Sequence, residues 1–424
     1  MEDLKTAKMG FAQRDITPSG TVETIGFGRE DNRSRGVLHP LLAQVSVWEY
    51  DGRRCALICI DHIGFHVSHA EKLREKVALQ LSTGKEQVML CFSHTHAAPN
   101  DSVETEYLEM VYRQVQEAVT QAKREMRPVY AAWGNAEADI GVNRRNGSGN
   151  LDRRIGILKV TDQNGKLRLL LLRLTAHANV LKSDNYLISS DFFGAVRLLL
   201  EKAYGCPVMA TQGAAGNVAP RFFCSDLAPV DAQGEAFIRS TDALADMARE
   251  VFRGTERVMA AISPKPVKSL HTYSIYAQFD ADVPDWTQAQ KVFREAKQYA
   301  GIDGSNWLKE VRRLLDDGIS QQKERVEIQY FTLNEGCLCG VPNELMCEFA
   351  LEVSQSLHDP YFYLGGYTNG CTGYWPTAEE YDRGGYEVFW SMLHYYPYYG
   401  RVFPLNRNSG KQLVQIVCEN MVHG

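Results

Sequence analysis

Two short, uninterrupted apolar runs constrain the fold of this chain most strongly. They are CALICI at residues 55–60 and VMLCF at residues 88–92. Runs of this length without alternating polar residues are typical of strands that are buried on both faces. Between them, residues 69–81 have helical spacing, with an apolar face that includes Leu73 and Val77. A buried strand, a helix and a second buried strand predict an α/β fold.

The same alternation continues along the chain. Residues 155–160 and 167–174 flank a turn with the sequence DQNG and predict a hairpin. Further helices are expected at 103–126, 192–204, 232–252 and 412–422, and further strands at 208–211, 270–279, 326–333, 336–341 and 361–367. We therefore predict mixed β-sheets flanked by helices, with no internal sequence repeat. Residues 1–424 are expected to form a single domain, with a helical insertion or subdomain at about 264–325.

Composition and charge exclude several classes of function. The chain has 46 Lys and Arg against 52 Asp and Glu, a formal net charge of −6, which argues against non-specific nucleic-acid binding. It has no apolar stretch long enough to cross a bilayer. The N-terminal residues lack the apolar core of a signal peptide, so we expect a cytoplasmic protein. The ten cysteines lack zinc-ribbon spacing and are expected to be buried hydrophobes. A small-molecule substrate is expected, and homo-oligomerisation stays open.

The sharpest local motif is SHTHAAP at residues 93–99, directly after a predicted buried strand. Loops in this position commonly bind ligands in α/β folds. In extended backbone, His94 and His96 would point the same way, so either could hold a metal while the other contacts substrate. Two hydrogen-bonded loop histidines are the structural alternative. The following residues do not supply the Asp-His of a metallo-β-lactamase, and the later elements of an amidohydrolase barrel are not clear.

Other candidate residues follow predicted strands or lie in small-residue loops. His177 comes after the Leu-rich strand, and Asp191 is expected to cap the next helix. Arg144 could bind a carboxylate, a phosphate or a carbonyl. Residues 210–220 form a glycine-containing loop that allows close approach to a ligand but lacks the Gly-Lys-Ser/Thr of a phosphate-binding loop. Glu344 places a carboxylate just past an apolar strand.

In their order along the chain, these segments resemble the N-terminal catalytic domain of the neutral (non-lysosomal) ceramidase family. The resemblance spans nearly the whole chain. Its motifs are GFAQRDITP at 10–18, GVLHP at 36–40, SHTH at 93–96, the Asn143-Arg144 turn, His177 with Ser190-Asp191, GNVAP at 216–220, VPNE at 341–344 and the pair Tyr374 and Tyr386. The resemblance implies a fold like that of the neutral-ceramidase catalytic domain.

The resemblance also implies one catalytic zinc ion and assigns roles around it. The implied metal ligands are His94, His177, Glu344 and Tyr374, and the implied catalytic residues are His96, Arg144 and Tyr386. Neutral imidazoles and a carboxylate suit Zn²⁺, although this ligand set is also compatible with manganese or iron. A tyrosinate ligand would require the metal to lower a pKa of about 10. His96, Arg144 and Tyr386 could then stabilise an oxyanion and shuttle protons, with Tyr386 polarising the scissile carbonyl.

One loop departs from the family pattern. Ceramide-hydrolysing members carry Gly-Asp-Val-Ser-Pro-Asn where this chain has GNVAPR at residues 216–221. Ala219 replaces the serine implicated in catalysis, and the immunoglobulin-like C-terminal domain of the ceramidases is not in this sequence. We expect Gly216, Asn217 and Arg221 to bind substrate, and the charge of Arg221 favours an anionic or sugar-like polar molecule over a lipid.

The sequence therefore predicts a zinc-dependent hydrolase that cleaves an amide or a related acyl bond in a small polar substrate, and not ceramide itself. Two alternatives stay open at this point. One is a metal-dependent lyase, isomerase or esterase that acts on a carbohydrate-like substrate. The other is a metal-containing binding protein without turnover, an option that Ala219 keeps open and that the complete set of proposed ligands argues against.

Overall fold

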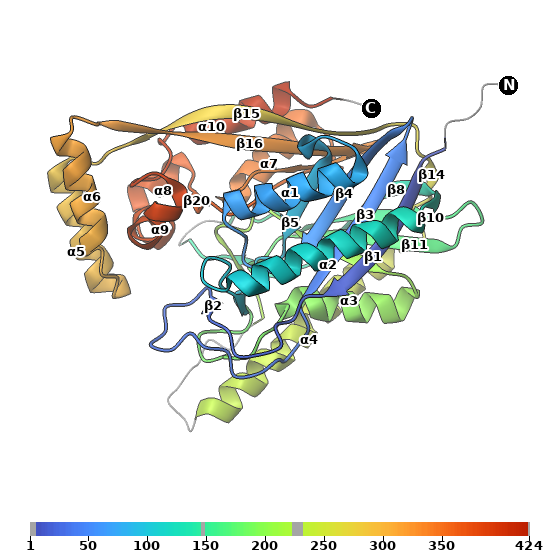
Figure 1. Ribbon diagram of the computed structural model, residues 1–424, viewed down its shortest axis with the longest axis horizontal. Coiled ribbons are helices and arrows are strands. Elements are labelled where there is room, and N and C mark those ends of the chain that lie inside the picture. Colours follow the sequence, from blue (N-terminus) through green and yellow to red (C-terminus); the bar gives the residue numbers. More distant parts are fainter. Residues whose placement is uncertain (1–5, 146–148, 223–231, 423–424) are drawn as a thin grey trace.

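Three β-sheets flanked by helices form the body of the molecule, as the sequence predicts (Figure 1). The computed structural model describes residues 6–145, 149–222 and 232–422, with side chains left out at 232–240. The first sheet has the order β5-β4-β3-β1-β7, with bounds Val88–Phe92, Arg53–Ile60, Leu42–Tyr50, Lys8–Asp15 and Arg127–Pro128. The second has the order β12-β11-β10-β8-β14, with bounds Val208–Gln212, Leu167–Leu174, Arg154–Thr161, Tyr130–Glu137 and Lys265–Pro266.

The third sheet and three short strand pairs complete the β structure of the described residues. The third sheet has the order β15-β16-β17-β19, with bounds Leu270–Asp282, Gln321–Leu333, Gly336–Gly340 and Phe362–Gly365. The pairs are β13 with β9 (Val218–Pro220 and Gly141–Asn143), β18 with β20 (Glu344–Leu345 and Tyr374–Trp375) and β2 with β6 (Thr24–Ile25 and Ala98–Pro99).

The predicted helices lie close to their expected positions, whereas α7, α8 and α9 were not predicted. Their bounds are α1 Val67–Leu81, α2 Thr105–Arg124, α3 Asp191–Tyr204, α4 Ala232–Met259, α5 Trp286–Ala300, α6 Ser305–Asp316, α7 Cys347–Leu357, α8 Ala378–Arg383, α9 Met392–Tyr399 and α10 Ser409–Glu419. A 3₁₀ turn, η1, covers Lys85–Gln87, and a π-helical turn, η2, covers Tyr386–Trp390.

The three large sheets share one local topology that the sequence does not reveal. In each, an antiparallel hairpin is followed by a helix and then by a strand parallel to the second hairpin strand. The three units are β3-β4-α1-β5, β10-β11-α3-β12 and β16-β17-α7-β19. This repeat is present in the structure but has no counterpart as a repeat in the sequence. Because neighbouring parallel strands end at the same sheet edge, each unit brings two loops together there.

The sheets are buried on both faces, as the apolar runs predict. Leu57 belongs to the apolar core between the three sheets, whereas its neighbour Ile58 belongs to the core under the helices. Leu158 and Ile157 divide between the two cores in the same way. Alternate side chains of a strand point to opposite faces, so these strands need apolar residues at every position.

Helices α5 and α6 lie within the predicted insertion at about 264–325. They are at the far end of the long β15–β16 hairpin, away from the other sheets (Figure 1). Trp307, Val311 and Leu314 of α6 form a small apolar core with Leu393 of α9. The flanks of the insertion are β14, β15 and β16, so the helices are held by strands that belong to the main body.

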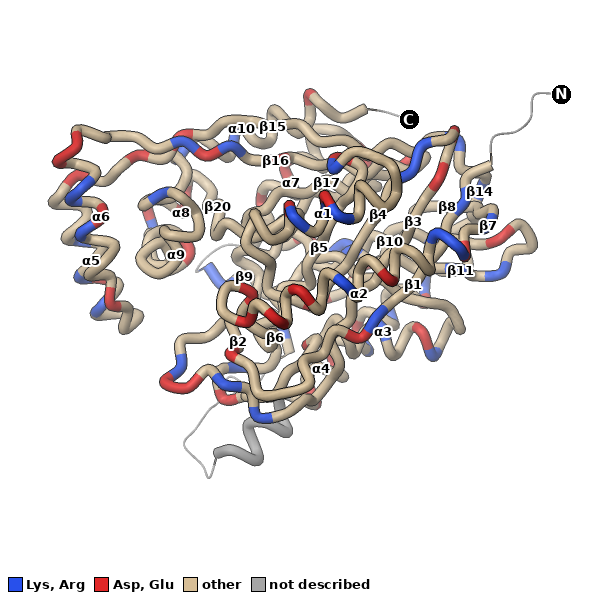
Figure 2. Tube along the Cα trace, viewed as in Figure 1, with Lys and Arg blue, Asp and Glu red and all other residues tan. Residues whose placement is uncertain are grey.

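The distribution of charged residues agrees with the moderate net charge. Figure 2 shows basic and acidic residues interspersed along the trace. None of the helices in the described ranges combines the length and the apolar character needed to cross a membrane. The cysteines described by the structure are unpaired thiols that are buried or half-buried, which confirms that they act as small apolar residues; Cys224 lies outside the described residues.

Candidate metal centre

Loops from all three large sheets meet at one point. His94 lies just past the end of β5, His177 just past β11 and Glu344 just past β17. The side chains of both histidines are almost fully buried, and Glu344 is 7% exposed. Each residue therefore follows the carboxyl end of a strand whose position is fixed by the packing of the sheets.

The ligand atoms of these three residues form a nearly equilateral triangle. The Nε2 atoms of His94 and His177 are 3.2 Å apart. Oε2 of Glu344 is 3.2 Å from Nε2 of His94 and 3.3 Å from Nε2 of His177. A tetrahedral zinc ion with bonds of about 2.0–2.1 Å holds its ligand atoms about 3.3 Å apart. The spacing therefore fits one small tetrahedral cation.

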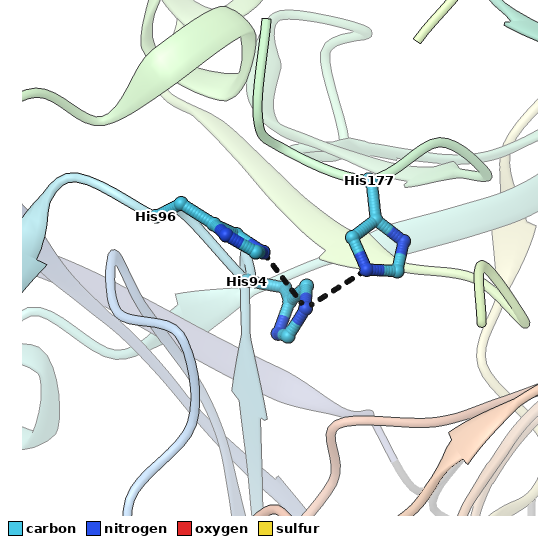
Figure 3. A group of neighbouring side chains, drawn as sticks. All are labelled: His94, His96 and His177. Atoms are coloured by element: carbon cyan, nitrogen blue, oxygen red, sulfur yellow. Dashed lines mark hydrogen bonds between the residues drawn. The ribbon is translucent and has the colours of Figure 1, made fainter. Parts of the chain in front are cut away.

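His96 belongs to the same cluster. Figure 3 shows the Nε2 atom of His94 facing those of both His96 and His177. The distance from His96 Nε2 to His94 Nε2 is 3.3 Å, and the ligand atoms of the three histidines all lie within 4.8 Å of one another. The three histidines could hold a metal ion, and His96 is close enough to either bind the ion or contact its substrate.

The other ring nitrogen of each histidine is held by a backbone carbonyl. Nδ1 of His94 lies 2.6 Å from the oxygen of Ile63, and Nδ1 of His177 lies 2.6 Å from the oxygen of Ala215. A carbonyl can only accept, so Nδ1 carries the proton in each ring. In its neutral form each ring therefore exposes an Nε2 lone pair, the form that binds metals.

This arrangement repeats the topology of the sheets. His94 follows β5 and bonds to the loop after its parallel neighbour β4. His177 follows β11 and bonds to the loop after its parallel neighbour β12. Nδ1 of His96 bonds to the oxygen of Gly26, next to β2, at 2.9 Å. All three tautomers are thus set by the fold.

Electrostatics favour the metal-binding protonation states. Burial, with the nearby Arg144 guanidinium, lowers the pKa of His177 to about 3. Burial and the neighbouring imidazoles also hold the pKa of His96 well below its usual range. Burial alone would raise the pKa of Glu344, but the imidazoles of His94 and His177 hold it well below its usual value. These shifts leave the His96 and His177 rings neutral and the Glu344 carboxylate ionised, which are forms that can bind a metal ion.

The carboxylate oxygen at the centre is not satisfied by hydrogen bonds. Oε2 of Glu344 is buried, and no described group bonds to it with hydrogen-bond geometry, although two imidazole nitrogens lie within 3.3 Å. A buried polar atom without a partner is costly. A cation between the three ligand atoms would satisfy it, so the donor set fits a bound metal ion.

The histidine loop is not extended, contrary to the prediction. His94 has a φ of 63°, a left-handed conformation that is rare for residues other than glycine. The rings of His94 and His96 are consequently nearly perpendicular, at 88°. The two side chains still converge, but because the backbone turns at His94 and not because alternate residues of a strand share a face.

Arg144 and Tyr374 lie beside the cluster. A terminal nitrogen of Arg144, Nη2, donates to the oxygen of Gly216 at 2.7 Å and to the Tyr374 hydroxyl at 3.2 Å. The Tyr374 ring stacks parallel to that of His177, with centroids 6.5 Å apart. Burial raises the pKa of Tyr374 well above its usual value, with Glu344 adding to the effect and Arg144 opposing it. A phenolate here would depend on a nearby cation.

Tyr386 completes this side of the site. Its ring meets that of Tyr374 edge to face, with centroids 6.1 Å apart. Burial raises the pKa of Tyr386 well above its usual range, so its hydroxyl keeps its proton. Arg144, Tyr374 and Tyr386 therefore form one contact chain beside His177 and Glu344.

The small-residue loop serves mainly to support these groups. A Cβ atom on Gly216 would lie 2.4 Å from the backbone carbonyl oxygen of Glu344, so only glycine allows the loop to approach the backbone of Glu344 this closely. Asn217 is buried and bonds through its side chain to the backbone of Cys347 and to Glu348. Both residues hold the segment that carries Glu344.

The surroundings of Arg221 and Asp191 differ from those expected from the sequence. Arg221 is exposed and forms an ion pair with Asp139, so its charge is already balanced at the surface. The residue before α3 is Ser190, and the buried Asp191 carboxylate accepts from the N–H groups of Phe192, Val180 and Leu181. Asp191 therefore ties the loop after His177 to the helix start, beyond the capping role predicted for it.

Two residues near the cluster were not singled out from the sequence. The Tyr367 ring packs on His94 with centroids 4.2 Å apart, and its buried hydroxyl has no partner among the described groups. Glu387 forms an ion pair with Arg144. Tyr367 could have been found from its position just past β19, at the same sheet edge as the other loops. Glu387 could have been found because it directly follows Tyr386.

Two solved structures share this fold over nearly the whole chain. A neutral ceramidase from Pseudomonas aeruginosa matches with a TM-score of 0.72 and 17% identity, over 99% of this chain and 74% of that one. A ceramidase in complex with C2 matches with a TM-score of 0.71 and 16% identity, over 98% and 74% of the two chains. No protein-family model matches the chain, and no curated protein matches its sequence. The chain thus has a ceramidase-like fold, which confirms the predicted fold.

Proposed function

We propose that this protein, built on a ceramidase-like fold, is a zinc-dependent hydrolase that cleaves an amide or a related acyl bond in a small polar substrate. One observation carries the proposal. The lone pairs of His94 and His177 and a carboxylate oxygen of Glu344 face one another in a buried space, at separations of 3.2 to 3.3 Å. Such an arrangement favours a bound cation, which would compensate the buried carboxylate and the facing lone pairs.

In this proposal His94, His177 and Glu344 are metal ligands, and Tyr374 is the fourth. Zinc would supply a Lewis acid and, with a water molecule as a further ligand beside the four side chains, would allow that water to lose a proton near neutral pH. The carbonyls of Ile63 and Ala215 orient the two imidazoles before any ion binds. Preorganised ligands of this kind raise metal affinity and hold the ion in one geometry.

The neighbouring side chains provide the remaining chemistry. The charge of Arg144 and the neutral hydroxyl of Tyr386 would stabilise negative charge that develops on the acyl oxygen. His96 has a neutral ring with an unprotonated Nε2, so it could accept a proton from water and deliver it to the leaving nitrogen. His96 adjoins the ligand triangle through His94, and Arg144 and Tyr386 adjoin it through Tyr374.

We propose a substrate smaller and more polar than ceramide. The support is Ala219, which lies in β13 where the ceramide-hydrolysing members of the family have serine. The pairing of Arg221 with Asp139 removes Arg221 as support for an anionic substrate. The remaining polar groups at the site, Arg144 and the two tyrosines, suit an N-acyl group attached to a hydroxylated or otherwise polar amine. We propose a cytoplasmic location for the reaction.

The test is a hydrolysis assay on zinc-loaded protein. The panel holds N-acylated amino sugars, N-acyl amino acids, the matching O-acyl esters and detergent-dispersed ceramide. Release of the free amine and of the acid is measured for wild type and for the double variant His94→Ala/His177→Ala. We expect amine release from at least one N-acyl compound by wild type only. Protein that binds zinc but releases neither product from any compound would contradict the hydrolase proposal.

A further inference from the structure

The carboxylate of Glu387 binds two consecutive arginines. Oε1 lies 2.8 Å from Nε of Arg144, and Oε2 accepts from Arg145 at 2.8 Å. Glu387 is 9% exposed, so its carboxylate is largely shielded from water, while Arg144 and Arg145 are half-buried. The Arg145 contact is a hydrogen bond and the Arg144 contact is a close ion pair without hydrogen-bond geometry, and loss of the carboxylate leaves both arginine charges without compensation.

Through Arg144, Glu387 is linked to the candidate metal centre. One side of the Arg144 guanidinium meets Glu387, and a terminal nitrogen meets the Tyr374 hydroxyl at 3.2 Å. Without the carboxylate, Arg144 would keep its bond to the oxygen of Gly216 but could rotate about it. The orientation of Arg144 toward Tyr374 thus depends on Glu387.

Glu387 also anchors the turn that carries Tyr386. Gly384 and Gly385, just before η2, have φ values of 62° and 90°. Glycine has no side chain to restrict its backbone, so the start of η2 depends on contacts from other residues. Arg145 reaches across to this turn and donates to the oxygen of Gly384 at 2.7 Å and to the carboxylate of Glu380. Since Tyr386 and Glu387 are adjacent, one carboxylate sets the position of both the tyrosine and the arginine.

We propose that Glu387 is a positioning residue for the reaction: it fixes Arg144 against Tyr374 and holds the η2 turn so that Tyr386 faces the metal centre. The inference rests on the proposed hydrolase function for its kinetic consequences, but the anchoring itself is independent of that function. A misplacement of about 1 Å in such groups can reduce a rate about a hundredfold.

The central comparison is between Glu387→Gln and Glu380→Gln. Glu380 binds Arg145 and Arg383 and so shares the contact with the turn, but its contacts do not include Arg144. We expect Glu387→Gln to lower kcat about 10- to 100-fold, with zinc content and KM little changed. Glu380→Gln should keep most of the wild-type kcat. Equal losses in the two variants would overturn the proposal.

A double-mutant cycle tests whether Glu387 acts through Arg144. In an Arg144→Lys background, Glu387→Gln should lower kcat much less than in wild type, because the group that it positions is already changed. Additive losses would overturn that route. If Glu387→Gln does not fold, Glu387→Asp replaces it, since the shorter side chain should hold only one of the two arginines and show the same non-additivity.

An activity-independent measurement separates this inference from the proposed function. Amide hydrogen exchange over residues 384–391 is compared in zinc-free wild type, Glu387→Gln and Glu380→Gln. We expect the fastest exchange in Glu387→Gln. Unchanged exchange in that variant would overturn the anchoring, even if the protein is an active hydrolase. Faster exchange in a protein without hydrolase activity would support the anchoring while the proposed function fails.

Discussion

The Nε2 atom of His94 lies 3.2 Å from the Nε2 atom of His177, and both Nδ1 atoms donate to backbone carbonyls, so in the neutral rings the two facing nitrogens carry lone pairs. Two lone pairs at this distance repel each other in a buried space. Glu344 adds a negative charge at nearly the same distance from both. The residues are arranged around a position that a cation would occupy, and this arrangement directs the predictions below.

The first prediction concerns metal binding. We expect about one zinc ion per chain by elemental analysis, and its loss in His94→Ala, His177→Ala and Glu344→Gln, because each change removes one corner of the ligand triangle. Zinc at about a thousand times its dissociation constant should stabilise the fold by about 4 kcal/mol, measured as a rise in Tm. His271→Ala, an exposed histidine on β15, is the control and should keep its zinc. Zinc retained by all three ligand variants would contradict the site.

The second prediction concerns the support of Glu344. In Gly216→Ala, the new Cβ atom would collide with the backbone of Glu344 and Leu345, so the carboxylate should move away from the histidines. We expect zinc affinity to fall about 10- to 100-fold, as it does when other groups that support metal ligands are changed. Competition with a chelator measures it. Gly28→Ala has open space around the added methyl and should bind zinc as wild type does; equal affinities in both variants would refute this role of Gly216.

The third prediction separates binding from catalysis. We expect His96→Ala and Tyr386→Phe to retain zinc but to lose hydrolysis, because the ligand triangle does not include either residue. Removal of a group that stabilises developing charge typically lowers kcat about 100- to 1000-fold. Zinc content and kcat are measured on the same preparations. If His96→Ala loses zinc as completely as His94→Ala, His96 is a metal ligand and the catalytic assignment is wrong.

The fourth prediction concerns pH and stability. Burial raises the pKa of Asp191 from 3.8 to about 6, only partly offset by three backbone N–H donors. Since the folded state favours the protonated form, this contribution to stability is complete below pH 3.8 and is lost as the pH rises through about 6. Asp191→Asn removes the titration. As the pH rises from 3.8 to about 6, wild type loses this contribution and Asp191→Asn does not. The free energy of unfolding of Asp191→Asn should therefore rise by about 3 kcal/mol relative to that of wild type.

Denaturant unfolding of zinc-free protein at several pH values checks this. The two proteins should differ most in their pH dependence between pH 4 and about 6, and the difference should level off at neutral pH. Parallel stability curves for wild type and Asp191→Asn would show that Asp191 does not titrate in this range in the folded protein.

The local elements were predictable because their signals are local. The run at residues 88–92 is β5, the helix expected at 192–204 is α3 with one more residue, and the hairpin at 155–174 forms as expected. Burial on both faces requires apolar residues at every strand position, and that requirement is visible in the sequence. His94, His177 and Glu344 were visible as candidate site residues for a related reason, since each is a polar residue shortly after an apolar strand, whereas their assignment as metal ligands, with Tyr374, came from the family resemblance.

Contacts between distant residues were less accessible. Arg221 was expected at the substrate, but its charge is balanced by Asp139. Glu387 and Tyr367 were overlooked because their importance comes from partners more than two hundred residues away in sequence. Ion pairs and ring contacts of this kind depend on how loops are placed by the sheets, and a single sequence carries no periodic signal for them.

By itself, then, the sequence determined the strands, the helices and the polar residues at the strand ends, because burial patterns follow from the side chains of one segment at a time. Only the tertiary structure decided that three hairpin–helix–strand units meet with the loops of β5, β11 and β17 at a common point. The packing of the sheets against one another sets that meeting point. It brings His94, His177 and Glu344, which are far apart along the chain, to within about the diameter of one ion and its ligand shell.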